Sequence, residues 1–455
     1  MATLTPGVAW RGAAVLLIAL ALWNSWWARG LFLDGYSLLA GMIRFGTWHT
    51  FYEPREHLMA ITQAPAALAI RAGLTDTQTL ARLLSIGLFA VPAIYYGAAL
   101  HRARRDPVLL SAVLIAIGLV YVPTSFFIVG EHNAICAMAI FVAVLLATAA
   151  RLSWGNGAAL ALTALVLFRS HEATLLLGPL LAGLTIWRMA ALGWRSPQAG
   201  LHALAAALFA GSGAIALASL FDFPNREQMN AAFGNALSFT NNIQFMLPFV
   251  AVLAVALAGL ARPRLLEGRG VYLGAGVLLA VAALSPLLWL LPGETRPLPK
   301  AHYETRQAAF VVAAGLAVFV YLYALLPHLP IAALQVVRRP AVGHRLLAFA
   351  AAVAAAALPA DLMLTELWRR SLGVFQATIA ARTFLIPVEE TPISREPWRH
   401  FVEEWTLPMQ SLVLRAGPAE GVIIPSRDFK GWQAFEPSAE LPDLHPYYWG
   451  GGSGR

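Results

Sequence analysis

Charged residues are scarce in this 455-residue sequence: Asp, Glu, Lys and Arg together make up 12% of it. A soluble globular chain has roughly 25% charged residues and about 45–50% apolar ones, whereas 59% of this chain is hydrophobic. The shortage of charge excludes a water-soluble enzyme of two or three domains. The excess of apolar residues also excludes a disordered chain. A multi-span membrane protein is the class that remains.

The sequence has a single cysteine, Cys136, inside an apolar run, so an intramolecular disulfide is excluded. Acidic residues are also fewer than basic ones, 24 against 32, which gives a net charge of +8. We expect no nucleic-acid partner, because no basic stripe is interleaved with stacking aromatic residues. Much of the excess arginine lies instead in short loops between apolar runs.

The apolar runs predict an all-α polytopic membrane protein with about eleven transmembrane helices, at about 20 residues per span. The first run, Val8–Ala28, ends in bulky tryptophans where a signal peptide would need small residues, so we expect an uncleaved anchor. We expect the short run 157–169 to form a segment separate from the next one. The other runs are residues 82–100, 107–129, 133–150, 157–169, 173–187, 201–221, 245–261, 271–292, 308–335 and 346–364.

The loops between these runs alternate in charge, which predicts their sides of the membrane. One set is short and rich in arginine, and the positive-inside rule places it, with the N-terminus, in the cytoplasm. This set contains Arg102, Arg104, Arg105, Arg151, Arg188, Arg195, Arg262, Arg264, Arg269, Arg338, Arg339 and Arg345. The other set is predicted to be external to a cell (inner) membrane and consists of residues 30–81, 130–132, 169–172, 222–244, 293–307 and the tail after 364.

Two domains follow from this division. Residues 1–364 form a transmembrane domain whose first external loop is 30–81. Residues 365–455 form a small external, periplasmic α/β domain, in which we expect Ser411–Arg415 and Val422–Ile424 to pair as a β-hairpin. The final residues 450–455 are a low-complexity end.

The first external loop begins with a short amphipathic segment. Leu39, Ile43 and either Tyr36 or Met42 share one face at helical spacing, with Arg44 opposite, which predicts an interfacial helix. Residues 62–65, Thr-Gln-Ala-Pro, predict a turn before the second span.

Asp34 follows the apolar run at the start of this loop and allows two interpretations. A carboxylate at a water–lipid boundary is partly desolvated, which raises its pKa. Such a group can accept a proton from a hydroxyl nucleophile. The alternative is an N-cap, whose side chain accepts backbone N–H groups of the following helix.

The other external turns carry residues that suit a phosphate or a sugar. Arg169 lies between two apolar segments, where it either binds an anion in a wet cavity or is a helix-end arginine that extends to the interface. Glu131-His132 and His171-Glu172 form two similar acidic–histidine pairs. They suit hydrogen bonds to phosphate or sugar; a divalent metal is the alternative, although the pairs lack a recognised ligand motif. Loop 293–307 contains Tyr303 and Arg306, and its alternative interpretation is a solvated loop with local ion pairs.

Taken in order, these features resemble the C-type glycosyltransferase superfamily (GT-C), which includes lipid A aminoarabinose transferases and protein O-mannosyltransferases. The likeness begins with Asp34 after the first span, Tyr36 two residues on, the interfacial helix and the proline before the second span. It continues in Arg82-Leu83-Leu84-Ser85 and in the pattern Trp154-Gly155, Phe168-Arg169-Ser170-His171-Glu172 and Leu177-Gly178-Pro179. The motifs cover about residues 20–190. Many members pair two acidic residues at the first-loop position, whereas Gly35 follows Asp34 here.

The resemblance implies a membrane glycosyltransferase that moves a sugar from a polyprenyl-phosphate carrier to an acceptor hydroxyl on the external face, with inversion. Asp34 would be the general base. Arg169, His171, Tyr303 and Arg306 would bind the donor phosphate. The substrate-binding candidates are Tyr36, Glu53, His57, Glu131, His132 and Glu172. The implied partners are the lipid-linked sugar donor, a glycan, lipid or protein acceptor and membrane lipids, with no certain cofactor.

The sequence leaves three alternatives open, one of which is a catalytically silent member of the same fold. A transporter or flippase would place its binding groups near the membrane midplane on broken helices, usually in symmetric halves. An external glycan polymerase or ligase would share the chemistry and the side of the membrane but would use a lipid-linked oligosaccharide donor.

Overall fold

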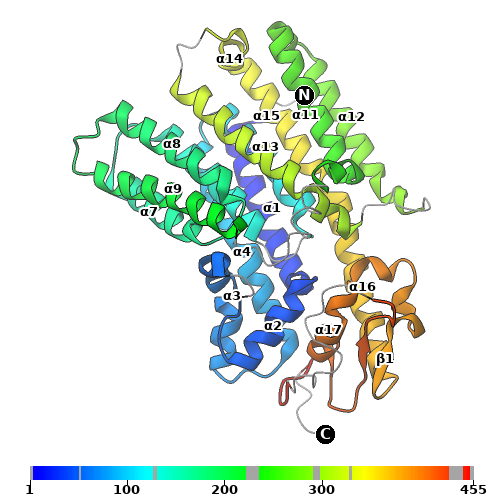
Figure 1. Ribbon diagram of the computed structural model, residues 1–455. Coiled ribbons are helices and arrows are strands. Elements are labelled where there is room, and N and C mark those ends of the chain that lie inside the picture. Colours follow the sequence, from blue (N-terminus) through cyan, green and yellow to red (C-terminus); the bar gives the residue numbers. More distant parts are fainter. Residues whose placement is uncertain are drawn as a thin grey trace.

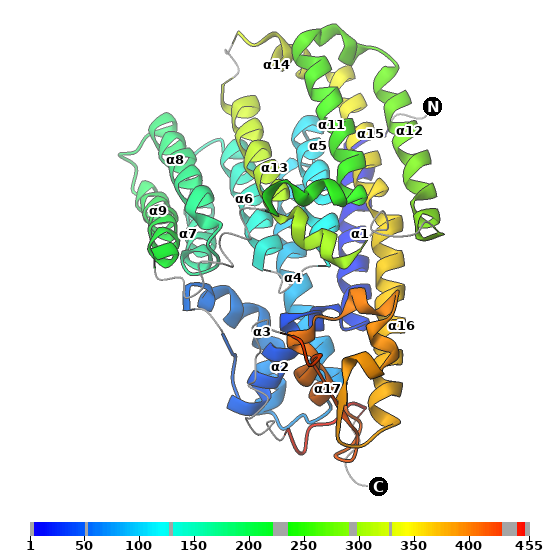
Figure 2. The same ribbon diagram turned by 45° about the vertical axis from the view of Figure 1, so that its right-hand side comes forward.

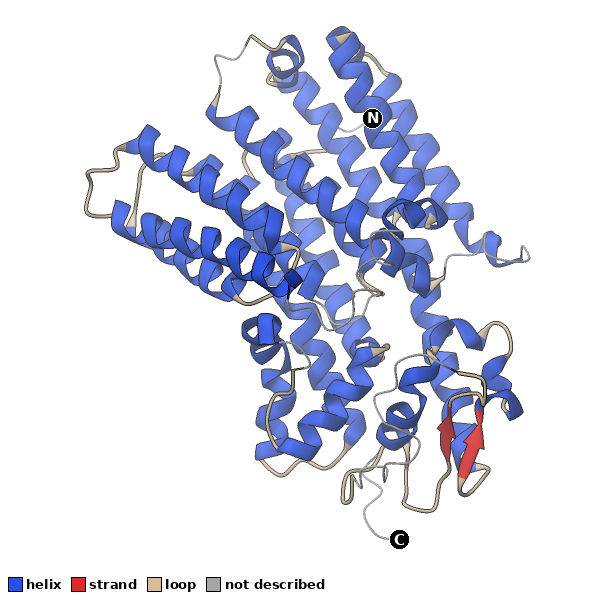
Figure 3. Cartoon of the chain, in the orientation of Figure 1, coloured by secondary structure: helices blue, strands red, loops and turns tan. Residues whose placement is uncertain are grey.

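The computed structural model describes residues 4–50, 53–126, 131–221, 235–290, 298–326, 330–429 and 444–450. These residues fold almost entirely as helices, with two short strands near the C-terminus (Figure 3). Ten of the described helical segments are long and apolar enough to cross a membrane. The predicted all-α polytopic fold is therefore confirmed.

The candidate spans match the predicted apolar runs one by one. The exception in length is α7 (Trp154–Phe168), which at about 1.5 Å per residue is too short for a bilayer of about 30 Å. It forms a helix of its own, as predicted, and packs against α9, which also packs against α8 (Figure 1). The spans are α1 (Pro6–Trp26), α4 (Thr77–Ala103), α5 (Pro107–Ala116) with η3 (Ile117–Tyr121) and η4 (Val122–Thr124), α6 (Glu131–Thr148), α8 (Thr174–Leu192), α9 (Ala199–Phe221), α11 (Ile243–Ala261), α12 (Gly270–Leu284), α13 (Pro299–Leu325) and α15 (Pro340–Ala356) with α16 (Leu358–Ala380).

Helices α5 and α6 form the centre of the bundle, and α1, α11 and α12 lie at its periphery. Nearly every side chain of α5 and α6 is buried, whereas the peripheral helices expose rows of leucine and valine. A helix that is apolar on all sides has no reason to face water, so the exposed rows are the surfaces suited to lipid. The centre of the bundle therefore consists of helices packed against one another, and its outer surface is suited to contact with lipid.

The helix ends separate into the two groups that the loop charges predicted (Figure 2). At one end, Arg102 donates a hydrogen bond to Asn156, Arg188 to the Ala149 carbonyl and Arg338 to the Tyr323 carbonyl. The arginine-rich loops thus meet one another. The C-terminal end of α1 and the N-terminal ends of α4, α6 and α8 lie at the opposite end, beside the first loop.

The first loop consists of two helices, α2 (Asp34–Phe45) and α3 (Glu56–Arg71), with a 3₁₀ turn η2 (Glu53–Arg55) between them. The amphipathic helix is confirmed: Tyr36, Leu39, Met42 and Ile43 are buried and Arg44 is exposed. The predicted turn at residues 62–65 is wrong, because this segment lies inside α3. A Cβ at Gly87 of α4 would lie 1.7 Å from the Thr62 carbonyl oxygen and 3.3 Å from the Pro65 ring, so α3 packs tightly on α4 here.

The C-terminal part begins on a continuous helix. Because α16 runs to Ala380, the boundary predicted at residue 364 falls within it. The predicted β-hairpin is wrong. Residues Leu407–Leu414 form helix α17, and strand β2 (Val422–Ile424) pairs in parallel with β1 (Leu385–Pro387). The pairing partner lies far upstream in the sequence, where local turn signals cannot reveal it. Short 3₁₀ turns at residues 388–390, 392–394, 398–401 and 404–406 connect these elements.

Candidate active site

Arg55, just before α3, lies between two carboxylates from other parts of the chain. Its Nε and Nη2 atoms donate hydrogen bonds to Glu172 at 3.0–3.2 Å, and its Nη1 lies 3.6 Å from Glu131. The Arg55 side chain is 18% exposed and that of Glu131 only 2%. Burial would lower the pKa of Arg55, but the charges of Glu131, Glu172 and Asp34 raise it above its ordinary value. We call Asp34, Arg55, Glu131 and Glu172 the Arg55 cluster.

Asp34 joins this cluster from the first turn of α2. Its side chain is half-buried. Burial raises the pKa of its carboxyl to about 6, and the positive charge of Arg55 opposes that rise. Within the described part of the chain, no hydrogen-bond donor reaches the carboxylate. A carboxylate in this state is available to accept a proton from a substrate at neutral pH.

The N-cap interpretation of Asp34 is wrong. Asp34 is the first helical residue, and the residue at the cap position is Leu33, which makes no side-chain capping bond. Leu33 has φ 55° and ψ −111°, a backbone conformation that side chains rarely adopt. Such a residue costs about 1–3 kcal/mol and persists only where the surroundings fix it. The carboxylate of Asp34 is thus presented by a strained turn and is not used to cap the helix.

Position 35 requires glycine for a steric reason. A Cβ added to Gly35 would lie 1.9 Å from the Gly30 carbonyl oxygen, so no side chain fits there. Gly30 is also confined, because its Cβ would lie 2.8 Å from side-chain atoms of Ser85 and Leu88. An acidic pair at positions 34 and 35 is therefore excluded. In this fold the further carboxylates, Glu131 and Glu172, come from other turns.

The Arg82–Ser85 segment that opens the second predicted span holds this turn in place. The Gly30 amide donates a hydrogen bond to the Ser85 hydroxyl at 2.9 Å. Arg82 donates to the Trp26 carbonyl at 3.2 Å, and its guanidinium lies 4.2 Å from the centre of the Trp26 ring. Both residues therefore contact the connection between α1 and α2, and neither belongs to the Arg55 cluster.

His171 and Glu172 lie in the connection between α7 and α8. The His171 Nδ1 accepts a hydrogen bond from the Ala173 amide, so the ring proton is on Nε2. Burial lowers the pKa of His171 to about 3, so the ring is neutral. Its 3.4 Å contact with Glu172 is therefore a polar contact between a neutral ring and a carboxylate. Burial alone would raise the pKa of Glu172, but the positive charge of Arg55 and its hydrogen bonds to the carboxylate hold the pKa well below its usual range.

Tyr303 and Arg306 approach the cluster from α13. They were predicted in a loop over residues 293–307, but Pro299 begins α13, so residues 299–307 are helical; proline suits the first helical turn. Arg306 donates a hydrogen bond to the Tyr303 hydroxyl at 2.9 Å, and its guanidinium lies 3.9 Å from the centre of that ring. The ring of His132 lies 6.2 Å from that of His171. Arg306 also interacts electrostatically with Glu172 and Arg55. Residues 291–297 lie outside the described residues.

Arg169 and His57 lie at the edge of the cluster. Arg169 forms a 2.6 Å ion pair with Glu56, and both side chains are partly exposed, 30% and 41%. The His57 ring contacts the Leu165 carbonyl at 2.8 Å, and the His57 amide donates to the Arg169 carbonyl at 3.0 Å. These contacts fasten the start of α3 to the end of α7. The residue at the centre is Arg55, which the sequence analysis did not single out.

The two remaining candidates are less informative. Tyr36 is buried against Trp368, with ring centres 6.3 Å apart, so it packs in the core beside Asp34. The side chain of Glu53 lies outside the described residues. Within the described part, no group of three His, Cys, Asp or Glu residues is arranged to hold a metal ion.

The geometry thus gathers most of the predicted residues at one end of the helix bundle. Asp34, Glu131, His132, His171, Glu172, Tyr303 and Arg306 interact with one another directly or through Arg55. Comparisons of the chain with protein-family models, with curated proteins and with solved structures found no match.

Proposed function

We propose that this multi-pass membrane protein is a glycosyltransferase. It moves a sugar from a polyprenyl-phosphate carrier to the hydroxyl of a glycan, lipid or protein acceptor. The observation that carries the proposal is the state of Asp34, a carboxylate with a pKa near 6 that lies beside Arg55 and accepts no hydrogen bond from the described residues. Burial and a neighbouring charge that together tune an acid toward neutral pH are typical of a catalytic base.

In the proposed reaction, Asp34 accepts the proton of the acceptor hydroxyl as the hydroxyl oxygen attacks the anomeric carbon. The bond from that carbon to the phosphate oxygen breaks, and the phosphate leaves with the bonding electrons. A single displacement inverts the anomeric centre. General-base catalysis of this kind contributes about 10²–10⁴-fold.

The polar groups around the cluster have different roles in this proposal. Arg306, Tyr303 and the Nε2–H of His171 bind the departing phosphate, since arginine forms charge-assisted hydrogen bonds with phosphate oxygens. Arg55 keeps the pKa of Asp34 from rising further. Arg169, already paired with Glu56, lies at the rim, where it can contact the carrier as it enters.

We infer that the reaction occurs on the external side of a cell (inner) membrane. The support is the separation of the helix ends: the arginine-rich loops are at the end opposite the Arg55 cluster, and such loops remain in the cytoplasm. The N-terminus is then cytoplasmic and the C-terminal domain is periplasmic.

A transfer assay with matched aspartate variants tests the proposal. Membranes holding the protein are incubated with undecaprenyl phosphates that carry radiolabelled glucose, mannose or aminoarabinose, and label in the acceptor fraction is measured. We expect transfer by the wild type and by Asp428→Asn, a change at an exposed residue of the C-terminal part, and a loss of at least 100-fold in Asp34→Asn. Equal transfer by a folded Asp34→Asn variant would remove the proposed base.

The same preparation distinguishes the alternatives. A transporter or flippase would move the labelled lipid across proteoliposomes without forming product. In the described part, the buried charges Arg29 and Glu131 lie at or beside the ends of their spans, whereas transporters bind substrates near the midplane. Asp361 lies near the junction of α15 and α16, where it is paired with Arg29. A polymerase or ligase would use a lipid-linked oligosaccharide and would leave the monosaccharide donors unused.

A further inference from the structure

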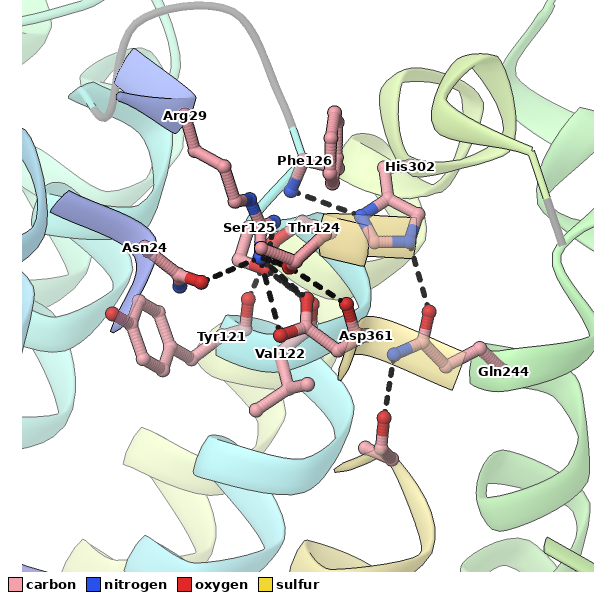
Figure 4. A network of polar contacts seen from close by, with 12 residues as sticks. Asn24, Arg29, Tyr121, Val122, Thr124, Ser125, Phe126, Gln244, His302 and Asp361 are labelled. Atoms are coloured by element: carbon pink, nitrogen blue, oxygen red, sulfur yellow. Dashed lines mark hydrogen bonds and ion pairs between the residues drawn. The ribbon is translucent and has the colours of Figure 1, made fainter. Parts of the chain in front are cut away.

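A second buried ionic network, separate from the Arg55 cluster, is centred on Arg29, five residues before Asp34 in the sequence (Figure 4). Its centre is an ion pair at 3.1 Å between Arg29, in the 3₁₀ turn η1 (Arg29–Leu31), and Asp361, near the start of α16. Both side chains are 1% exposed. Neither residue belongs to a motif that predicts a role from the sequence.

Three other segments of the chain meet at the Arg29 guanidinium. Its Nη1 donates to Asn24 at the end of α1 at 2.8 Å and to Thr365 of α16 at 2.9 Å. Its Nη2 donates to Ser125 at 3.0 Å, and the Ser125 hydroxyl in turn contacts Asp361 at 2.8 Å. The ring of Phe126 lies 4.1 Å from the guanidinium. The position of Arg29 is therefore determined from several directions.

This network is costly if stability is its only purpose. Removing two charges from water costs several kcal/mol per ion, and replacing a buried ion pair with apolar residues is often neutral or stabilising. What the ion pair supplies is geometry, because a guanidinium held by four hydrogen-bonding partners can occupy only one position. The backbone it fixes is strained, with φ 51° at Ala28 and 55° at Leu33.

One face of α16 contacts the whole turn that leads to Asp34. Asp361, Thr365 and Trp368 are spaced at four and three residues and so share a side of the helix. The Trp368 indole donates a hydrogen bond to the Trp27 carbonyl at 2.9 Å, and its ring packs edge-on against Phe32 at 5.7 Å. The opposite side of α16 carries Glu366 and Arg370, which are exposed and paired with each other.

We propose that Arg29 and Asp361 are positioning residues: their ion pair fixes the strained turn so that Asp34 lies in line with the acceptor hydroxyl. This inference rests on the proposed role of Asp34 as base. Neither residue touches the substrate, and both act through Asp34. Because α16 continues to Ala380, the same pair ties the base to the helix that leads into the C-terminal part.

The test compares Asp361→Asn with Glu366→Gln, a charge removal on the exposed side of the same helix. We expect Asp361→Asn to lower kcat by about 10–100-fold with the donor KM unchanged, since an error of about 1 Å in a reacting group can cost 10²-fold. Glu366→Gln should keep the wild-type values. Asp361→Glu keeps the negative charge on a side chain that is one methylene group longer, and it should recover part of kcat. A rise in KM with kcat unchanged would overturn the positioning role.

Hydrogen–deuterium exchange separates this inference from the proposed function, because it requires no substrate. We expect faster exchange of the peptide 28–36 in Asp361→Asn and unchanged exchange in Glu366→Gln. Unchanged exchange in Asp361→Asn would overturn the inference even if transfer were lost. Faster exchange in Asp361→Asn, combined with a wild type that transfers no sugar, would overturn the proposed function and leave the turn-fixing role of the ion pair intact.

Two milder variants cover the case in which Asp361→Asn does not fold. Thr365→Val removes one hydrogen bond of Arg29, whereas Ser125→Ala removes one of Arg29 and one of Asp361; both leave the ion pair in place. We expect each to lower kcat by about 2–10-fold, since a lost hydrogen bond costs about 0.5–1.5 kcal/mol. Wild-type kcat in both variants would contradict the proposal.

Discussion

Arg55 binds both carboxylate oxygens of Glu172, its Nη2 lying 3.0 Å from Oε2, although the two residues are 117 positions apart in the sequence. This contact joins the start of α3 to the connection between α7 and α8. The same guanidinium lies against Glu131 at the start of α6. One residue of the first loop thus connects three helix ends, and Asp34 lies beside it.

Removing the Arg55 charge should destabilise the fold strongly. Arg55→Gln leaves Glu131 and Glu172 without a counter-charge, and breaking a buried pair from one side costs about 3–5 kcal/mol. The free energy of unfolding in detergent, measured by chemical denaturation, checks this. Arg382→Gln, at an exposed pair with Glu390, is the control and should cost less than about 1 kcal/mol. If both variants lost the same free energy of unfolding, the ion pairs of Arg55 would contribute no more to stability than an exposed ion pair does.

Position 35 should accept no side chain. Gly35→Ala drives a methyl group into the Gly30 carbonyl oxygen, so we expect lower stability and lost transfer. The matched control is Gly97→Ala in α4, where a Cβ meets nothing within 4 Å. That change should stabilise the helix by about 0.5–1 kcal/mol. Thermal unfolding of both variants gives the comparison, and a stable, active Gly35→Ala protein would refute the close approach.

The transfer rate should depend on pH through Asp34. The base must be ionised, and its pKa is raised to about 6, so the rate should rise as the pH passes through about 6 and level off above it. Arg55 lowers this pKa, so in folded Arg55→Gln the rise should move to higher pH. The pH profile of kcat/KM measures both effects. A profile that is flat between pH 5 and 8 would assign the proton transfer to another group.

The stability of Asp34→Asn should separate lost chemistry from lost folding. Because the folded pKa of Asp34 is raised, the protonated form favours the folded state, and this contribution is lost as the pH rises through about 6. A neutral amide avoids that cost, so Asp34→Asn should be at least as stable as the wild type at pH 8. A lower melting temperature of the variant at that pH would contradict the assignment.

The two ends of the bundle should differ in their access to a membrane-impermeant maleimide. The native Cys136 is fully buried and should not react. We expect Arg395→Cys, in the C-terminal part, to be labelled on spheroplasts, and Arg105→Cys to be labelled only after the membrane is broken. The reverse pattern would invert the proposed orientation.

The fold was predictable because it follows from composition and charge. Apolar runs of about 20 residues have few alternatives to a membrane helix, so α1, α4 and α6 match their predicted runs closely. The alternation of arginine in the loops predicted which turns share an end of the bundle. The loop charges alone therefore predict that Asp34, Glu131 and Glu172, which are remote in sequence, lie on one side of the membrane.

The errors arose where a contact is made between distant parts of the chain. Arg55 lies in a run of mixed charges that looks solvated, and only its two partners reveal its role. Pro65 suggested a turn, but α3 accommodates it because the helix packs on Gly87. Asp361 stands near the end of an apolar run, where an ionisable residue is costly. This cost indicates that Asp361 must have a buried partner, but it does not identify Arg29 as that partner.

The most direct test of the account is a structure of the protein with undecaprenyl phosphate bound. We predict the phosphate beside Arg306 and Tyr303, with the carboxylate of Asp34 facing the position of the sugar carbon. The isoprenoid chain should extend along the lipid-exposed surface of the bundle. A phosphate bound at the opposite end, among the arginine-rich loops, would contradict the account.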